Sequence, residues 1–195
     1  MKRTLLIIGL IIFTFTTVNA QKGVDFGLKG GINFSNMTSD NFAENDSKTG
    51  FHIGLISEIP LGDKFSVQPE ILYSSQGTKA KLLMLGGSPS PGEYTLDYIQ
   101  IPVLAKFYIV QNLSLEVGPS FNFLVKDEEV RNTVTNSNIG NNFEFSGVLG
   151  VSYKLKAGIF GSARYVNGFT VALDRESHNE DAKNVGFQLG VGYVF

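Results

Sequence analysis

Few residues of this 195-residue chain have side chains suited to catalysis or metal binding. There is no cysteine, and neither of the two histidines, His52 and His178, lies in a catalytic or metal-binding motif. Disulfides, thiolate zinc sites and a cysteine nucleophile are therefore excluded, and a histidine metal cluster has too few ligands. With 16 basic against 18 acidic residues, the chain also lacks the positive excess of a nucleic-acid-binding protein. We therefore expect no enzyme, no cofactor, no metal site and no nucleic-acid partner.

A set of charged residues stands out because each lies singly within an otherwise apolar, alternating segment. These residues are Lys29, Glu58, Glu70, Lys106, Glu116, Lys154 and Arg164. A charge that protein encloses must be paired, since an unpaired buried charge is strongly destabilising. The sequence therefore predicts an interior polar network in which these cations and carboxylates balance one another. The alternative interpretation is an ion path or gate through the same interior.

The segments that carry these charges alternate apolar and polar residues with a period of two, which is typical of β-strands with two different faces. Eight such segments follow one another, at residues 26–34, 51–59, 65–73, 99–107, 113–123, 145–153, 159–165 and 185–195. Their lengths suit the roughly 9 to 11 tilted residues with which a strand crosses a bilayer. The sequence therefore predicts an all-β chain.

The connections between these segments alternate in length. Long polar connections lie at 35–49, 78–93, 126–142 and 169–183, and short ones at 61–64, 110–112 and 155–158. An up-and-down barrel with long loops on one side and tight turns on the other has this rhythm. We predict an eight-stranded antiparallel up-and-down transmembrane β-barrel that forms one domain over residues 21–195.

The composition of the two faces indicates that the apolar face meets lipid. The polar face is sparse and half glycine, and aromatic residues, Tyr108 among them, lie near the strand ends, where membrane barrels place their interfacial girdles. Eight strands enclose an interior that side chains fill, so a broad pore is not expected. Two alternatives remain open: a soluble periplasmic calycin-like barrel that binds a small apolar ligand, and a narrow, ion-conducting, porin-like barrel.

Residues 1–20 have the order of a secretory signal peptide. Lys2 and Arg3 precede an apolar stretch from Leu5 to Phe15, and Ala20 ends a small-residue cleavage site. The apolar stretch is too short to span a bilayer comfortably. We expect cleavage after Ala20 and export of the mature chain.

The long connections contain one unusual apolar run, formed by Leu82, Leu83, Met84 and Leu85. Loops are usually polar and exposed apolar patches mark contacts, so this run is a candidate contact site. The alternative is that it continues a hairpin beyond the membrane and packs on its neighbour. Acidic loop residues such as Asp40 are expected mainly to be solvated, with binding of divalent cations that bridge lipopolysaccharide as the alternative.

Several strings resemble those of the PorT-like outer-membrane β-barrel proteins of Bacteroidetes. They are GLKGGINFSN at 27–36, QPEILYS at 68–74, YIQIPV at 98–103, LEVGP at 115–119, RY at 164–165 and GVGYVF at 190–195. The resemblance implies an eight-stranded barrel in the outer membrane, related in architecture to OmpA and OmpX barrels. It also implies that the terminal Phe195 is the signal read by the barrel-assembly machinery.

The same resemblance bears on partners. It implies outer-membrane lipid and lipopolysaccharide as surroundings, and it raises a link to type IX secretion, with envelope or secretion-system proteins as partners. We expect a monomer with a structural or interaction role, whose long extracellular loops make its specific contacts.

Overall fold

The structure, a computed structural model, describes residues 23–38, 42–82, 90–131, 134–136, 140–172 and 182–195. The signal peptide expected over residues 1–20 lies outside these residues, as do Leu83, Met84 and Leu85 of the candidate contact site. Within the described ranges, no helix is long and apolar enough to cross a membrane.

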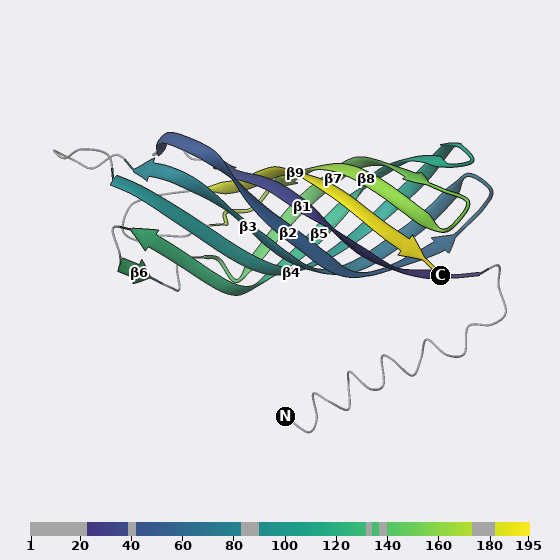
Figure 1. Cartoon of the computed structure of the whole chain (residues 1–195), viewed down its shortest axis with the longest axis horizontal. Coiled ribbons are helices and arrows are strands. Elements are labelled where there is room, and N and C mark those ends of the chain that lie inside the picture. Colours follow the sequence, from purple (N-terminus) through teal and green to yellow (C-terminus); the bar gives the residue numbers. More distant parts are fainter. Residues whose placement is uncertain (1–22, 39–41, 83–89, 132–133, 137–139, 173–181) are drawn as a thin grey trace, which may run out of the picture.

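The described residues form nine antiparallel strands arranged around a closed barrel (Figure 1). They are β1 (Asp25–Thr38), β2 (Phe42–Pro60), β3 (Phe65–Leu82), β4 (Ser90–Val110), β5 (Leu113–Arg131), β6 (Val134–Asn136), β7 (Phe143–Lys154), β8 (Ile159–Gly168) and β9 (Lys183–Val194). Sequential strands pair around the wall, and β1 pairs with β9 to close it. The short β6 pairs with the end of β5 only. The wall itself continues from β5 to β7, with which β5 also pairs. The prediction of an eight-stranded antiparallel up-and-down barrel is thereby confirmed.

Period-two alternation gives this wall an inner and an outer face, because successive side chains of a strand point to opposite sides. In β8, for example, Phe160, Arg164 and Val166 are buried, whereas Ile159 and Tyr165 are exposed. The same alternation runs through β7. Every charged residue at an inward position is therefore directed to one shared lumen.

The outer face carries large apolar side chains, which is the reverse of a water-soluble barrel. Leu55, Val117 and Leu149 are 59%, 56% and 59% exposed, whereas Glu70 and Glu116 are 1% and 0% exposed. Apolar surface on this scale is unfavourable in water and favourable in lipid. The distribution contradicts the soluble calycin-like alternative, which requires an apolar lining and a polar exterior.

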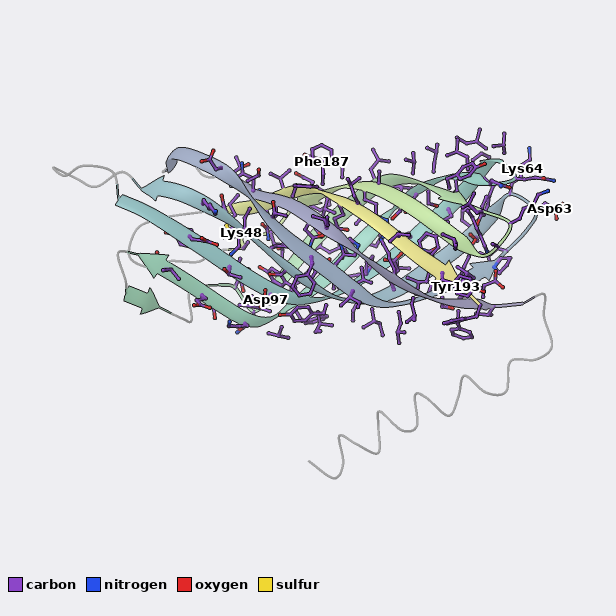
Figure 2. The ribbon with its side chains drawn as sticks, in the orientation of Figure 1. Lys48, Asp63, Lys64, Asp97, Phe187 and Tyr193 are labelled. Carbon is purple, nitrogen blue, oxygen red and sulfur yellow. The ribbon has the colours of Figure 1, made fainter. Side chains whose placement is uncertain are left out.

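Aromatic side chains ring the outer face at two levels, with aliphatic side chains between them. Near the long connections, ring centroids lie 5.2 to 5.8 Å apart in the pairs Phe51–Tyr73, Phe121–Phe145, Phe123–Phe143 and Tyr165–Phe187. Near the tight turns, the exposed aromatics are Phe26, Phe65, Phe107, Tyr153, Tyr193 and Phe195. Figure 2 shows Phe187 and Tyr193 projecting away from the barrel. Two such girdles mark the two water–lipid interfaces of a membrane barrel.

Four strands continue well beyond the girdle at the long-connection end. Strands β2 to β5 have 18 to 21 residues, whereas β7, β8 and β9 have 10 to 12. Figure 1 shows these four strands running past the end of the barrel on the side of β6. We call their outer parts, residues 42–48, 77–82, 90–97 and 124–131, the extension.

The extension corrects the prediction of four long loops. The connection expected at 78–93 is mostly strand, because β3 continues to Leu82 and β4 begins at Ser90. The connections expected at 35–49 and 126–142 are likewise shortened by the ends of β1, β2 and β5. Outside the membrane a strand needs no apolar outer face, so the backbone ladder continues after the apolar alternation has ended.

The opposite end of the barrel has the predicted tight turns. Leu61 N donates to Phe65 O at 2.9 Å, and Leu155 N donates to Ile159 O at 2.7 Å. Gly158 has a φ of 84°, a conformation that favours glycine. Short turns face the periplasm in outer-membrane barrels, so we call this end the periplasmic end.

Candidate functional site

The candidate functional site is the lumen, where charged side chains of six strands meet. Lys29, Glu58, Glu70, Lys106, Glu116 and Arg164, from β1, β2, β3, β4, β5 and β8 respectively, are each at most 4% exposed. All six lie at inward positions, so the alternation of each strand delivers its charge to the same space. The structure thus brings together six of the seven residues that the sequence singled out, and we call them the lumen network.

Arg164 is the centre of the lumen network because its guanidinium binds two carboxylates at once. Its Nη1 and Nη2 donate to Glu70 Oε2 and Oε1 at 2.8 and 2.7 Å, and its Nε donates to Glu116 Oε2 at 2.7 Å. Gly150 is the Cα partner of both Arg164 and Glu116, and a Cβ there would lie 2.7 Å from Arg164 Cγ. The missing side chain therefore leaves room for the guanidinium to cross β7.

Two lysines complete the lumen network. Lys106 Nζ lies 3.3 Å from Glu58 Oε2 and 3.8 Å from Glu116 Oε1, and it donates to Gln68 Oε1 at 2.9 Å. On the other side of the lumen, Lys29 Nζ lies 3.7 Å from Glu70 Oε2. Each carboxylate therefore has at least one cation within 4 Å.

The charges of the lumen network sum to zero, because Lys29, Lys106 and Arg164 face Glu58, Glu70 and Glu116. Balanced pairing avoids the large penalty of an unpaired buried charge, and the bidentate Arg164–Glu70 pair also fixes geometry. Chemically, the arrangement can hold the wall together across the lumen and occupy its cross-section. Among the described residues there is no group of three or more His, Asp or Glu side chains that could hold a metal ion.

Lys154, the seventh residue singled out, lies outside the lumen network. Its Nζ lies 3.1 Å from Asp25 Oδ2, and the two side chains are 29% and 38% exposed. Lys154 is the last residue of β7, so an inward direction there leads to the periplasmic mouth rather than to the centre of the lumen. The same mouth is an open hollow of about 620 Å³, which both residues line.

Sequence reasoning missed two kinds of partner in the lumen. Ser66 and Gln68 share the inward positions of β3 with Glu70, and Ser66 Oγ donates to Glu58 Oε1 at 2.9 Å. The sequence did contain a signal for them, because both residues are polar and lie at the same alternate positions as Glu70. Tyr108 was expected in an aromatic girdle, but it shares the parity of Lys106 and its hydroxyl donates to Glu58.

A second polar cluster lies beside the lumen network. Asn33 Nδ2 donates to Phe51 O at 3.0 Å, to Ser75 O at 2.9 Å and to Ser74 Oγ at 2.9 Å. Asn33 Oδ1 lies 2.8 Å from His52 Nδ1. His52 is therefore held as a buried structural side chain.

Apolar side chains close both ends of this polar interior. Toward the extension, the buried cluster comprises Met37, Tyr94, Leu96, Tyr98, Ala172 and Ala182, with Leu124 packed against it. Toward the periplasm, Ile56, Phe160 and Val194 form another cluster. Because apolar constrictions repel water and ions, these clusters are suited to obstruct the lumen together with the ion pairs.

On the outer surface of the extension, Lys48 ties β2 to β4. Its Nζ lies 3.0 Å from Glu93 Oε1 and also donates to Thr95 Oγ1, and the aliphatic chain crosses β3 over Gly77, which has no side chain. The hydrogen bond from Lys48 lowers the pKa of Glu93 below its usual range. This polar surface marks where the outer face leaves the lipid.

Of the candidate contact site, the structure describes Leu82 alone. Leu82 is the last residue of β3 and is the Cα partner of both Phe42 and Ser90. The run therefore begins inside a hairpin of the extension. Contact by its other residues stays a prediction.

Several proteins of known structure have the same architecture. The chain matches the crystal structure of Ail, the attachment invasion locus protein of Yersinia pestis, with a TM-score of 0.54 and 16% identity over 89% of this chain and 100% of Ail. It matches Neisserial surface protein A (NspA) with a TM-score of 0.58 and 13% identity over 89% of this chain and 100% of NspA. It also matches OprG from Pseudomonas aeruginosa with a TM-score of 0.50 and 13% identity over 90% of this chain and 97% of OprG. At these identities the likeness shows a shared fold.

The sequence itself gives the family. No curated protein matches the chain. The family model described as the outer membrane protein beta-barrel domain matches residues 19–174, which is most of the chain. This match agrees with the lipid-facing belt of the barrel. The chain belongs to the outer membrane protein β-barrel domain family.

Proposed function

We propose that this protein is a non-enzymatic, non-conducting outer-membrane barrel that presents the extension as a contact surface outside the cell. The observation that carries the proposal is the unequal length of the strands: β2 to β5 continue past the aromatic girdle, whereas β7 to β9 end near it. Strands that serve only to cross a bilayer need roughly 9 to 11 residues. The additional residues therefore serve a purpose outside the membrane.

The obstructed lumen supports the same proposal. A balanced set of buried ion pairs lies between two apolar clusters, and this arrangement suits an anchor better than a channel. Ail, which has a similar fold, is named the attachment invasion locus protein. A role in surface contact is therefore the function that we assign to the extension.

The orientation that the proposal requires can be tested with single cysteines, because the chain has none of its own. Lys126→Cys lies in the extension at a side chain that is 62% exposed, and Asp63→Cys lies in the β2–β3 turn at the other end. On intact cells, a membrane-impermeant maleimide should label Lys126→Cys, and it should label Asp63→Cys only after the outer membrane is permeabilised. Labelling in the reverse order would contradict the proposal.

The contact role can be tested by shortening one hairpin. Lys79 and Glu93 are Cα partners, so residues 80–92 can be replaced by an Asn-Gly turn that joins β3 to β4 in register. We expect the shortened barrel to keep its heat-dependent gel mobility and to lose adhesion of expressing cells to surfaces. Undiminished adhesion by a correctly folded shortened barrel would overturn the contact role.

A further inference from the structure

Three buried polar atoms in the lumen belong to side chains that lie around Gly190. They are Lys29 Nζ, His52 Nε2 and Ser162 Oγ, and none has a hydrogen-bond partner among the described residues. The Cβ position of Gly190 lies 2.7 Å from Lys29 Cε, 2.9 Å from Ser162 Oγ and 3.2 Å from His52 Nε2. Because each buried polar atom without a partner costs free energy, one shared partner at this point would satisfy all three.

The register of the barrel explains why these side chains lie around Gly190. Ser162, Gly190, Gly31 and His52 are successive Cα partners across β8, β9, β1 and β2. The two glycines leave the inner face bare between Ser162 and His52, and the Cβ position of Gly31 lies 2.6 Å from His52 Cε1. The polar ends of the flanking side chains therefore lean over the same bare backbone.

The hydrogen-bonding role of each atom follows from its neighbours. Asn33 Nδ2 donates to the backbone carbonyls of Phe51 and Ser75, which fixes the orientation of its amide. Asn33 Oδ1 therefore faces His52 Nδ1, so Nδ1 carries the hydrogen and Nε2 of the neutral ring is an acceptor. Lys29 Nζ can only donate, and the hydroxyl of Ser162 can do both.

A neutral molecule that both donates and accepts fits this set. An anion would leave His52 Nε2 without a donor, and it would add a charge to a network whose charges already sum to zero. A cation would be repelled by Lys29. We propose that one internal water molecule sits beside Gly190, accepts from Lys29, donates to His52 Nε2 and shares a hydrogen bond with Ser162.

This water would join two clusters that are otherwise separate. On one side Lys29 pairs with Glu70 of the lumen network, and on the other His52 binds Asn33. An internal water typically makes about three hydrogen bonds to buried polar groups and is costly to remove. With it, the lumen network and the Asn33–His52 pair form one connected unit.

The tautomer of His52 provides the first test. The variant His178→Gln leaves His52 as the single histidine, so the imidazole of the ¹⁵N-labelled barrel can be assigned directly in lipid nanodiscs. We expect a neutral ring with the proton on Nδ1 and a hydrogen-bonded Nε2. A proton on Nε2 would overturn the proposal.

Crystallography provides the second test. Wild-type crystals should show one ordered peak within about 3.2 Å of Lys29 Nζ, His52 Nε2 and Ser162 Oγ. The peak should be lost in Gly190→Ala and kept in Gly161→Ala, whose added Cβ meets an atom only at 4.0 Å. No wild-type peak, or a bromide anomalous signal there after soaking, would overturn the proposal. If Gly190→Ala fails to fold, the wild-type density and the tautomer still decide.

Discussion

Arg164 shows how a single side chain holds the strands around the lumen together. Its guanidinium joins β8 to β3 and β5 through Glu70 and Glu116, and it is 2% exposed. Removing it would leave two carboxylates in a buried space with Lys29 and Lys106 as their remaining partners. Loss of one partner from a buried ion pair is strongly destabilising because the other charge stays buried.

We predict that Arg164→Met lowers the free energy of unfolding by about 3–5 kcal/mol. The matched control is Lys154→Met, because the Lys154–Asp25 pair is partly exposed and such pairs contribute roughly 0–1 kcal/mol. Urea unfolding of both variants in the same lipid provides the measurement. Equal losses in the two variants would contradict a buried network centred on Arg164.

Tyr108 tests the lumen network from its periplasmic side. Tyr108→Phe removes the hydroxyl that donates to Glu58, and we expect it to lower stability by about 1–3 kcal/mol. Tyr153→Phe is the control, since Tyr153 lies on the outer face with 49% of its surface exposed, and its loss should stay within about 0.5 kcal/mol. A larger loss of stability in Tyr153→Phe than in Tyr108→Phe would contradict a stabilising role of the Tyr108 hydroxyl in the lumen.

Parity along each strand was enough to predict which residues face the lumen. It placed Lys29, Glu70 and Arg164 inside, but it did not show that Lys154 lies too near a strand end to reach the centre. The choice of partners was beyond the sequence, because Arg164 and Glu70 lie 94 residues apart on strands that are not neighbours. Only the closed wall brings them together.

Strand β5 passes from the lipid belt of the barrel into the water beyond the girdle. Val117 and Val125 both lie on its outer face, with 56% and 54% of their surfaces exposed. Phe123, a member of the girdle, lies between them and pairs with Phe143. Val117 is therefore in the lipid belt and Val125 is in the extension.

We predict that Val117→Arg lowers the free energy of unfolding by about 2–4 kcal/mol, the cost of an arginine near the bilayer midplane. Val125→Arg has the same chemistry on the same strand, and we expect a change within about 1 kcal/mol because the site faces water. Unfolding in lipid vesicles measures both. Similar losses of unfolding free energy at the two positions would contradict a membrane boundary at the girdle.

The Lys48–Glu93 contact predicts how the extension responds to acid. The folded-state pKa of Glu93 is lowered, so its contribution is present above the ordinary glutamate pKa of about 4.3 and is lost as pH falls through the folded value. Amide hydrogen exchange, corrected for intrinsic rates, should show less protection of the extension near pH 3 than near pH 6. In Glu93→Gln this difference should shrink, and an unchanged difference would assign it to other groups.

The elements inside the lipid were predictable and the extension was not. A lipid-facing strand must alternate, so segments such as 26–34 and 113–123 stand out in the sequence. In water both faces of a strand can be polar, so β3 beyond Gly77 has no such signature. Its strand conformation comes from backbone pairing with β4.

The whole molecule combines a lipid-facing exterior, an interior filled with polar and apolar side chains, and a sheet that continues beyond the lipid belt. The apolar exterior anchors the barrel in the membrane, and side chains of the lumen network and of the apolar clusters at its two ends fill the interior, so we assign the contact role to the extension. Fold and orientation of the faces followed from alternation and loop rhythm. The obstruction depends on side chains that meet only after the barrel closes.

Conductance across a planar lipid bilayer is the most direct measurement of that obstruction. Folded wild-type protein, checked for its heat-dependent gel mobility, should give no steady current above that of the bare lipid, because ion pairs and apolar clusters fill the lumen. Sustained, voltage-independent channel steps from the wild-type barrel would contradict a sealed lumen and would restore the ion-path interpretation.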